Sequence, residues 1–136
     1  MFTAFAVATM FAAGGAQAAT VSVSNTNDNL VGSLRQAIQD AATGDTIVFD
    51  IPTADSGYNA DTGVFAITLT SGELLISKDL TISGADKKIS IHRADPGTMP
   101  RFRIINITAG NVLLANLTIA NGAYLTDGSA FITRLI

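Results

Sequence analysis

One short segment carries side chains suited to removing a proton. His92–Asp95 reads His-Arg-Ala-Asp, and Arg101 and Arg103 follow it. In polysaccharide lyases a basic side chain removes a proton while Ca²⁺ held by carboxylates acidifies the sugar. That chemistry requires several carboxylates that converge from successive parts of the fold, and Asp86 and Asp95 are the acids beside this segment. We therefore interpret these side chains as solvated turn residues, and we predict no catalytic residue.

Other acidic residues also lack the patterns that metal or sugar chemistry requires. In Asp55–Asn59, a glycine stands where a calcium loop needs an oxygen ligand, so we interpret this stretch and Asp61 as a protruding loop. Glu73 is the only glutamate, whereas a glycosidase needs two acids that face each other. We find no Ser/His/Asp nucleophile arrangement and no Gly-rich phosphate loop. We predict no metal and no cofactor.

Several asparagines stand in glycosylation sequons or at regularly spaced turn positions. Asn106 and Asn116 each begin a glycosylation sequon, but in an exported β protein we interpret them as strand and turn residues. Asn111, Asn116 and Asn121 recur at expected turns. Stacked amides there would form hydrogen bonds between successive turns of a fold, which is a structural role.

Composition excludes some classes of partner. The chain has 136 residues, of which 14% are charged, and its formal net charge is −3. Without a basic run, it has no electrostatic footprint for nucleic acid or anionic lipid. Because it contains no cysteine, a disulfide framework and a thiolate metal site are excluded. Its length allows one domain at most.

The first eighteen residues have the features of a secretory signal. Met1–Ala18 has no charge and ends in Ala16-Gln17-Ala18, the small-x-small pattern that signal peptidase accepts. The usual basic start is missing, and a start site upstream of Met1 would explain that. The alternative is a short membrane anchor, but about 13 apolar residues are too few for a span of about 20. We therefore predict a signal peptide over 1–18, an exported mature chain over 19–136 and no transmembrane span.

One helix is predicted, over Ser33–Ala42. Ser33 stands at the N-cap position with Gln36 three residues on, which is the capping-box spacing. Leu34 and Ile38 belong to an apolar stripe with i, i+3, i+4, i+7 spacing. Gly44 stands beyond the end, where a left-handed residue stops a helix. A lone helix with one apolar face, followed by strands, is suited to covering the open end of a stack.

The rest of the chain alternates between short apolar segments and small polar turns. Alternation predicts short strands, at 20–24, 45–51, 65–70, 74–76, 80–83, 89–92, 101–108, 112–114 and 117–120. Ile67–Gly84 is similar to Ile105–Gly122, and this alignment places Leu80-Thr81-Ile82 on Leu117-Thr118-Ile119. Repeated short strands predict a solenoid with turns of roughly 20–25 residues.

The segment Gly32–Ala37, Gly-Ser-Leu-Arg-Gln-Ala, resembles the CSLREA motif of a group of bacterial surface proteins, with Gly for the cysteine and Gln for the glutamate. The order of segments across Val21–Gly122 is similar to the start of those proteins. The resemblance implies an exported, pectate-lyase-like, right-handed parallel β-helix whose N-terminal helix caps the first coil. The chain is similar also to autotransporter and outer-membrane passenger domains. Such proteins continue for many coils, whereas Ala123–Ile136 loses the repeat, so we expect an N-terminal piece of something longer.

The predicted fold class is therefore all-β: a right-handed parallel β-helix of roughly four coils with a short N-terminal capping helix. Besides the cap residues and Gly122, the structural residues are those expected to point inward: Leu34, Ile38, Ile47, Phe49, Ile67, Leu69, Leu80, Ile82, Ile89, Ile91, Leu117 and Ile119.

Three hypotheses for function follow from this fold. The first is a non-enzymatic secreted or cell-surface module, adhesin-like, whose lateral face binds a polymer or a partner protein. The second is the N-terminal fragment of a polysaccharide lyase or glycoside hydrolase whose catalytic coils lie beyond Ile136. The third is a structural stalk. In each case we expect self-association through an unpaired C-terminal coil.

Overall fold

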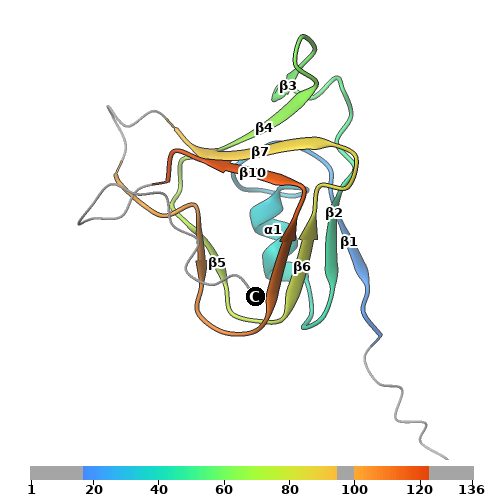
Figure 1. Cartoon of the computed structure of the whole chain (residues 1–136), viewed down its shortest axis with the longest axis vertical. Coiled ribbons are helices and arrows are strands. Elements are labelled where there is room, and N and C mark those ends of the chain that lie inside the picture. Colours follow the sequence, from blue (N-terminus) through green and yellow to red (C-terminus); the bar gives the residue numbers. More distant parts are fainter. Residues whose placement is uncertain (1–16, 95–99, 123–136) are drawn as a thin grey trace, which may run out of the picture.

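A computed structural model describes residues 17–94 and 100–122 of the chain. These residues form a β-solenoid of about three turns with one short helix. The chain visits three sheets in rotation, so strands that are neighbours in space lie far apart in sequence (Figure 1). Of the predicted signal peptide, only Gln17 and Ala18 are described, and both are exposed.

Each sheet collects one strand from successive turns. Sheet A contains, in spatial order, β1 (Thr20–Val23), β2 (Thr46–Phe49), β6 (Leu80–Ser83) and β9 (Val112–Ala115). Sheet B contains β10 (Leu117–Ala120), β7 (Lys88–Arg93), β4 (Val64–Leu69) and β3 (Tyr58–Asn59), and sheet C contains β5 (Leu74–Ile76) and β8 (Ile105–Ile107). All neighbours are parallel except β3, which runs antiparallel to β4.

Aliphatic side chains stack in register inside the solenoid. Ile47 pairs with Ile82, and Ile67 pairs with Ile91. Side chains alternate across a strand, so one face of each strand fills the core while the other meets solvent. Fully burying one such side chain contributes about 1.5–3 kcal/mol. The residues predicted to point inward are buried, apart from Leu117 and Ile119 on the last described strand, which are half-buried.

The predicted alignment of the two repeats does not match the pairing in space. Leu80 pairs with Val112 on sheet A, whereas Leu117 pairs with Ile89 on sheet B. The alignment is therefore wrong, because it matches strands that belong to different sheets. Strands of every sheet alternate in the same way toward one core, so their sequences look alike. Turns are also mostly longer than predicted: residue 46 pairs with residue 81, although residue 64 pairs with residue 88.

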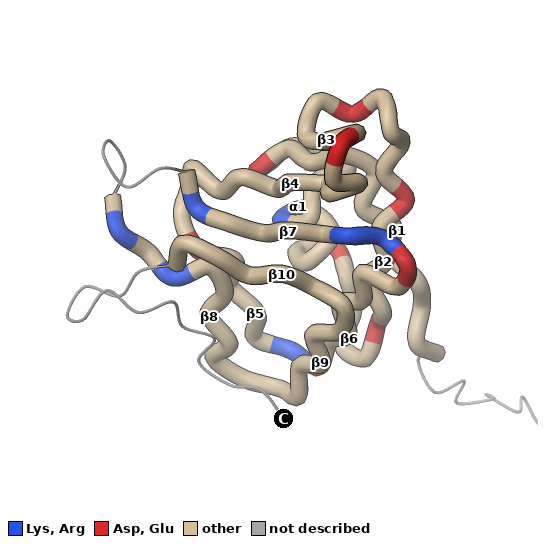
Figure 2. Tube along the Cα trace, turned by 45° about the horizontal axis from the view of Figure 1, so that its top comes forward, with Lys and Arg blue, Asp and Glu red and all other residues tan. Residues whose placement is uncertain are grey.

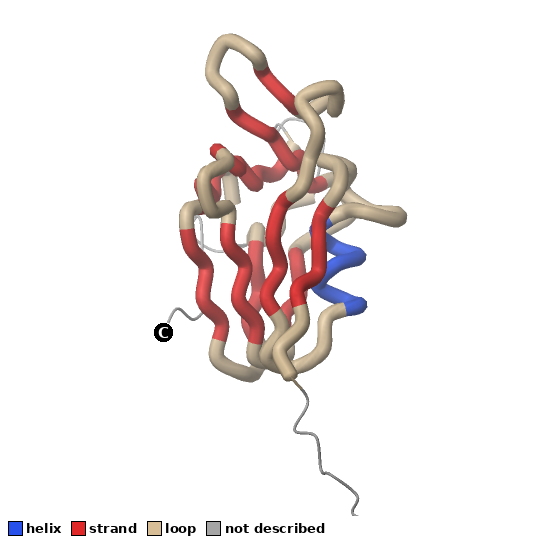
Figure 3. Tube along the Cα trace, turned by 90° about the vertical axis from the view of Figure 1, so that its right-hand side faces the viewer, coloured by secondary structure: helices blue, strands red, loops and turns tan. Residues whose placement is uncertain are grey.

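Helix α1 (Leu34–Asp40) lies at one end of the stack, beside β1 and β5 (Figure 3). It buries Leu34, Ala37 and Ile38 against the core. Ser33 is its N-cap residue, and its Oγ accepts a hydrogen bond of 3.2 Å from the backbone N–H of Gln36. This satisfies one of the donors that a helix start leaves without an intrahelical partner.

The helix is shorter than the predicted Ser33–Ala42, and its end differs. Ala41 has extended backbone angles, φ −61° and ψ 137°, so the helix stops before Gly44. Lys78 Nζ donates to the Ala41 carbonyl, which places a cation at the negative end of the helix dipole. Gly44 has φ +93°, but it belongs to the turn into β2, where its N–H donates to the Asp79 carbonyl at 2.8 Å.

Candidate functional site

The residues of the predicted solvated cluster around His92 do not share one face, because successive side chains of β7 point to opposite sides of the sheet. His92 lies on the outer side, where its Nε2 is 3.0 Å from the Thr68 hydroxyl on the adjacent strand β4. Arg93 points inward and is only 4% exposed, so the prediction of a solvated turn residue is wrong for it. Asp86 is exposed in the turn before β7, and Asp95 lies outside the described residues. The cluster therefore supplies no convergent set of groups within the described part.

The acidic loop before β4 projects beyond the stack (Figure 3). Hydrogen bonds fix its base. Asp55 accepts from the N–H and hydroxyl of Thr26 and, at 2.8 Å, from the N–H of Gly57. Desolvation raises the pKa of Asp55, but these hydrogen bonds outweigh it and hold the pKa below its ordinary value. Across residues 17–94 and 100–122, no three His, Asp or Glu side chains are grouped as metal ligands.

Glu73 and the asparagines have structural partners. The carboxylate of Glu73, just before β5, accepts from Arg103 Nε at 3.0 Å and from Asn106 Nδ2 at 2.7 Å. Asn116 and Asn121 take left-handed turn conformations, with φ of 55° and 58°. The backbone N–H of Asn111 donates to Asp79 Oδ1 in the preceding turn at 2.7 Å, and stacking of the asparagine amides stays a prediction.

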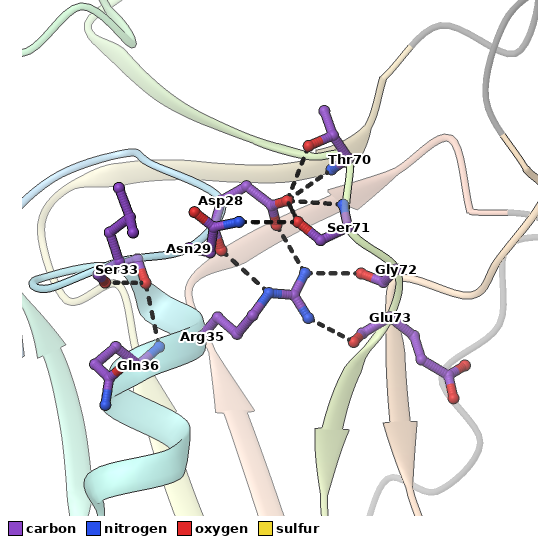
Figure 4. A network of polar contacts seen from close by, with 10 residues as sticks. Asp28, Asn29, Ser33, Arg35, Gln36, Thr70, Ser71, Gly72 and Glu73 are labelled. Atoms are coloured by element: carbon purple, nitrogen blue, oxygen red, sulfur yellow. Dashed lines mark hydrogen bonds and ion pairs between the residues drawn. The ribbon is translucent and has the colours of Figure 1, made fainter.

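The densest polar network joins the N-terminal segment to the corner between β4 and β5 (Figure 4). Asp28 Oδ1 and Arg35 Nη2 form an ion pair of 2.7 Å. Arg35 also donates to the backbone carbonyls of Gly72 and Glu73, each at 2.8 Å. Arg35 therefore connects the first turn of α1 to a corner that lies 37 residues later in the chain.

Asp28 Oδ2 completes this network on the other side of the carboxylate. It accepts from the backbone N–H groups of Thr70 and Ser71, at 3.1 and 2.7 Å, and from both hydroxyls. Desolvation raises the pKa of Asp28, but hydrogen bonds from Arg35, Ser71 and Thr70 outweigh it and lower the pKa to about 2. The sequence carries no local signal for this network, because Asp28 stands in the pattern of a polar turn.

A second carboxylate holds the segment between α1 and β2. Asp45 accepts from the backbone N–H of Ala19 and from that of Ala42, each at 2.8 Å. These two hydrogen bonds lower the pKa of Asp45, against desolvation and with help from the charge of Lys78. Asp28, Asp45 and Asp55 thus act in the same way: each carboxylate accepts backbone N–H groups near the N-terminal end of the solenoid.

The outer side of sheet A presents a row of hydroxyl groups. Thr20, Thr46 and Thr81 occupy paired positions on β1, β2 and β6, and Leu113 continues the row on β9. Strand spacing places successive side chains about 4.8 Å apart. A hollow of about 250 Å³ adjoins the row, and Thr81, Leu113, Asn111 and the acidic Asp79 are among its lining residues. We call Thr20, Thr46, Thr81 and Leu113 the threonine row.

Charged residues lie outside this row. Figure 2 shows the Lys, Arg, Asp and Glu positions gathered at strand ends and in turns, while the middles of the strands are free of them. On sheet A, none of β1, β2, β6 and β9 carries a charged residue. The outer side of sheet A is therefore an uncharged surface of hydroxyl and small apolar groups.

Comparison of the chain with protein-family models, with curated proteins and with solved structures finds no match. In the described part of the chain, no helix has the length and apolar character needed to cross a bilayer.

Proposed function

We propose that this chain is a non-enzymatic, exported module that binds a polymer or a partner protein through the lateral face of a right-handed parallel β-helix. The threonine row carries the proposal. Its hydroxyls repeat at the strand spacing on strands that carry no charged residue, which suits a ligand that also repeats and that offers hydroxyl or amide groups. The adjoining hollow adds a concave edge against which such a ligand can pack.

The roles of the acidic residues support a binding module. Asp28, Asp45 and Asp55 accept hydrogen bonds from backbone N–H groups, and Glu73 pairs with Arg103. The hydrogen bonds to Asp28, Asp45 and Asp55 lower the pKa of each and favour its ionised form, because protonation would remove the charge that these bonds stabilise. A general acid needs a proton to give at working pH, so these residues suit a structural role better than a catalytic one.

Export and cell-surface location are proposed from the sequence features. The Ala16-Gln17-Ala18 pattern supports secretion, and the resemblance of Gly32–Ala37 to the CSLREA motif supports an adhesin or autotransporter-passenger class. Ser33, Leu34 and Arg35 of that segment act in the cap, as N-cap, core residue and corner contact. This agrees with a segment that caps the first coil of a β-helix of roughly four coils.

The test is to incubate the chain with a panel of insoluble polysaccharides and with extracellular matrix proteins. Bound protein is measured by co-sedimentation, and released reducing or unsaturated sugar is measured in the same samples. We expect saturable binding to at least one member and no sugar release. Release of unsaturated sugar would favour the lyase hypothesis, and absence of binding throughout the panel would favour the stalk.

A further inference from the structure

We propose that Arg93 is the anchor of a binding site for a carboxylate-bearing ligand. This site is separate from the threonine row, since Arg93 belongs to β7 of sheet B and its side chain points to the interior. Two observations point to a ligand: the guanidinium is buried, and part of its hydrogen-bonding capacity is unused.

The burial of Arg93 follows from the alternation of its strand. Ile89 and Ile91 point inward on β7, and Arg93 is the next inward position, paired with buried Leu69 on β4. An arginine side chain cannot lose its charge in a protein, so burial cannot be relieved by deprotonation. A buried cation without an anion is costly, because the solvation that water supplied must be replaced.

The described partners of Arg93 satisfy the guanidinium in part. Its Nε donates to the Asn121 carbonyl at 3.1 Å, and its Cζ lies 5.9 Å from the centre of the Phe102 ring. Its Nη1 is buried and has no hydrogen-bond partner. Within residues 17–94 and 100–122, ion pairs join Arg35 to Asp28 and Arg103 to Glu73, and no carboxylate of these residues pairs with Arg93.

The surroundings define the chemistry of the ligand. Nη1 supplies donors for an anion, and a carboxylate accepts from guanidinium groups in a planar geometry. A single arginine balances one negative charge, which matches a monoanionic carboxylate better than a phosphate dianion. The half-buried Phe102 ring beside the guanidinium offers an apolar surface, so a carboxylate on an aromatic or aliphatic body suits this place. Phe102 is itself half-buried and Asn121 is exposed, so the two described partners of the guanidinium both reach solvent.

Sodium benzoate is a suitable probe, with benzamide as an uncharged analogue and sodium chloride as the ionic-strength control. The full chain is titrated with each, and the thermal unfolding midpoint is recorded. A ligand that binds only the folded state raises the midpoint as its concentration passes the Kd. We expect benzoate to raise the midpoint and benzamide and chloride to leave it nearly unchanged. We expect the Arg93→Gln variant to lose at least tenfold in benzoate affinity, while Arg101→Gln, at an exposed position nearby, retains it.

A second measurement covers the case in which Arg93→Gln does not fold. In the wild-type chain, the arginine Nε–Hε resonances are followed by NMR, and Arg93→Lys assigns the signal of Arg93. Benzoate should shift the Arg93 signal and leave that of Arg101 in place. The proposal is overturned if the wild type responds equally to benzoate and benzamide, or if Arg93→Gln binds benzoate like the wild type. It is also overturned if benzoate changes neither the unfolding midpoint nor the Arg93 signal of the wild type.

Discussion

Asp28 and Arg35 form an ion pair with Oδ1 and Nη2 2.7 Å apart, and both residues continue to the same corner of the solenoid. Asp28 accepts the N–H groups of Thr70 and Ser71, while Arg35 donates to the next two carbonyls, those of Gly72 and Glu73. The pair therefore joins the segment before α1 to the backbone between β4 and β5. We infer that this network fixes the cap on the first complete turn.

Replacing Asp28 by Asn should destabilise the chain at neutral pH. The change removes a carboxylate with a folded pKa of about 2 and an ordinary value of 3.8. Such a difference corresponds to about 2 kcal/mol, and we expect about 1–2 kcal/mol because solvent near the corner screens the ion pair. Urea unfolding at pH 7 measures this loss. Asp86→Asn, an exposed turn residue, is the control and should change stability by less than about 0.5 kcal/mol.

The same carboxylate predicts a pH dependence. Because the folded pKa of Asp28 lies below the unfolded value, its stabilising contribution is present above about pH 4 and is lost as pH falls toward 2. Urea midpoints measured across this range should fall for the wild type and fall less for Asp28→Asn. Parallel curves for the two proteins would contradict the assigned role.

Substitutions at two glycines with positive φ can measure separately the costs of backbone strain and of close packing between turns. A Cβ on Gly110 would lie 2.3 Å from the backbone carbon of Lys78 in the preceding turn, whereas a Cβ on Gly72 would meet no atom within 4 Å. Gly72→Ala should therefore cost about 1–2 kcal/mol from backbone strain. Gly110→Ala should cost about 2 kcal/mol more, because the turns must move apart. Equal losses in urea unfolding would show that the turns are not packed as described.

Ser33 both caps α1 and bonds the preceding turn. Its Oγ accepts from the N–H of Gln36 and donates to the Leu30 carbonyl at 2.8 Å, and the residue is fully buried. Ser33→Ala should cost about 1–2 kcal/mol. Exposed Ser77→Ala is the matched control. A loss for Ser33→Ala no larger than that of the control would exclude a capping role.

The end of the stack opposite α1 should drive association between chains. In the described part, β8, β9 and β10 each pair on one edge only, and unpaired strand edges attract other strands. Sedimentation should show concentration-dependent association, and Ile119→Lys on β10 should weaken it by placing a charge at the half-buried end. Leu75→Lys, on the exposed side of β5, should not. A monomer at all concentrations would contradict this expectation.

Local alternation was sufficient to predict most strands, and the bounds of Leu74–Ile76, Leu80–Ser83 and Leu117–Ala120 match the prediction. It could not assign a strand to a side of the solenoid, because each side faces the same core with the same pattern. The sequence does contain a signal for the burial of Arg93, because Arg93 continues the alternating inward positions of Ile89 and Ile91. By contrast, the role of Asp28 depends on partners 42 residues away and leaves no local pattern.

One comparison of variants tests most directly whether the threonine row binds the ligand. Thr46→Lys combined with Thr81→Lys places two charges in the middle of the row, while Thr53→Lys places one in the exposed loop after β2. For the panel member that the wild type binds, dissociation constants are measured for all three proteins, with circular dichroism to establish that each is folded. We predict that the double variant loses at least tenfold in affinity and that Thr53→Lys binds like the wild type. A folded double variant with wild-type affinity would contradict the proposal that this face binds the ligand.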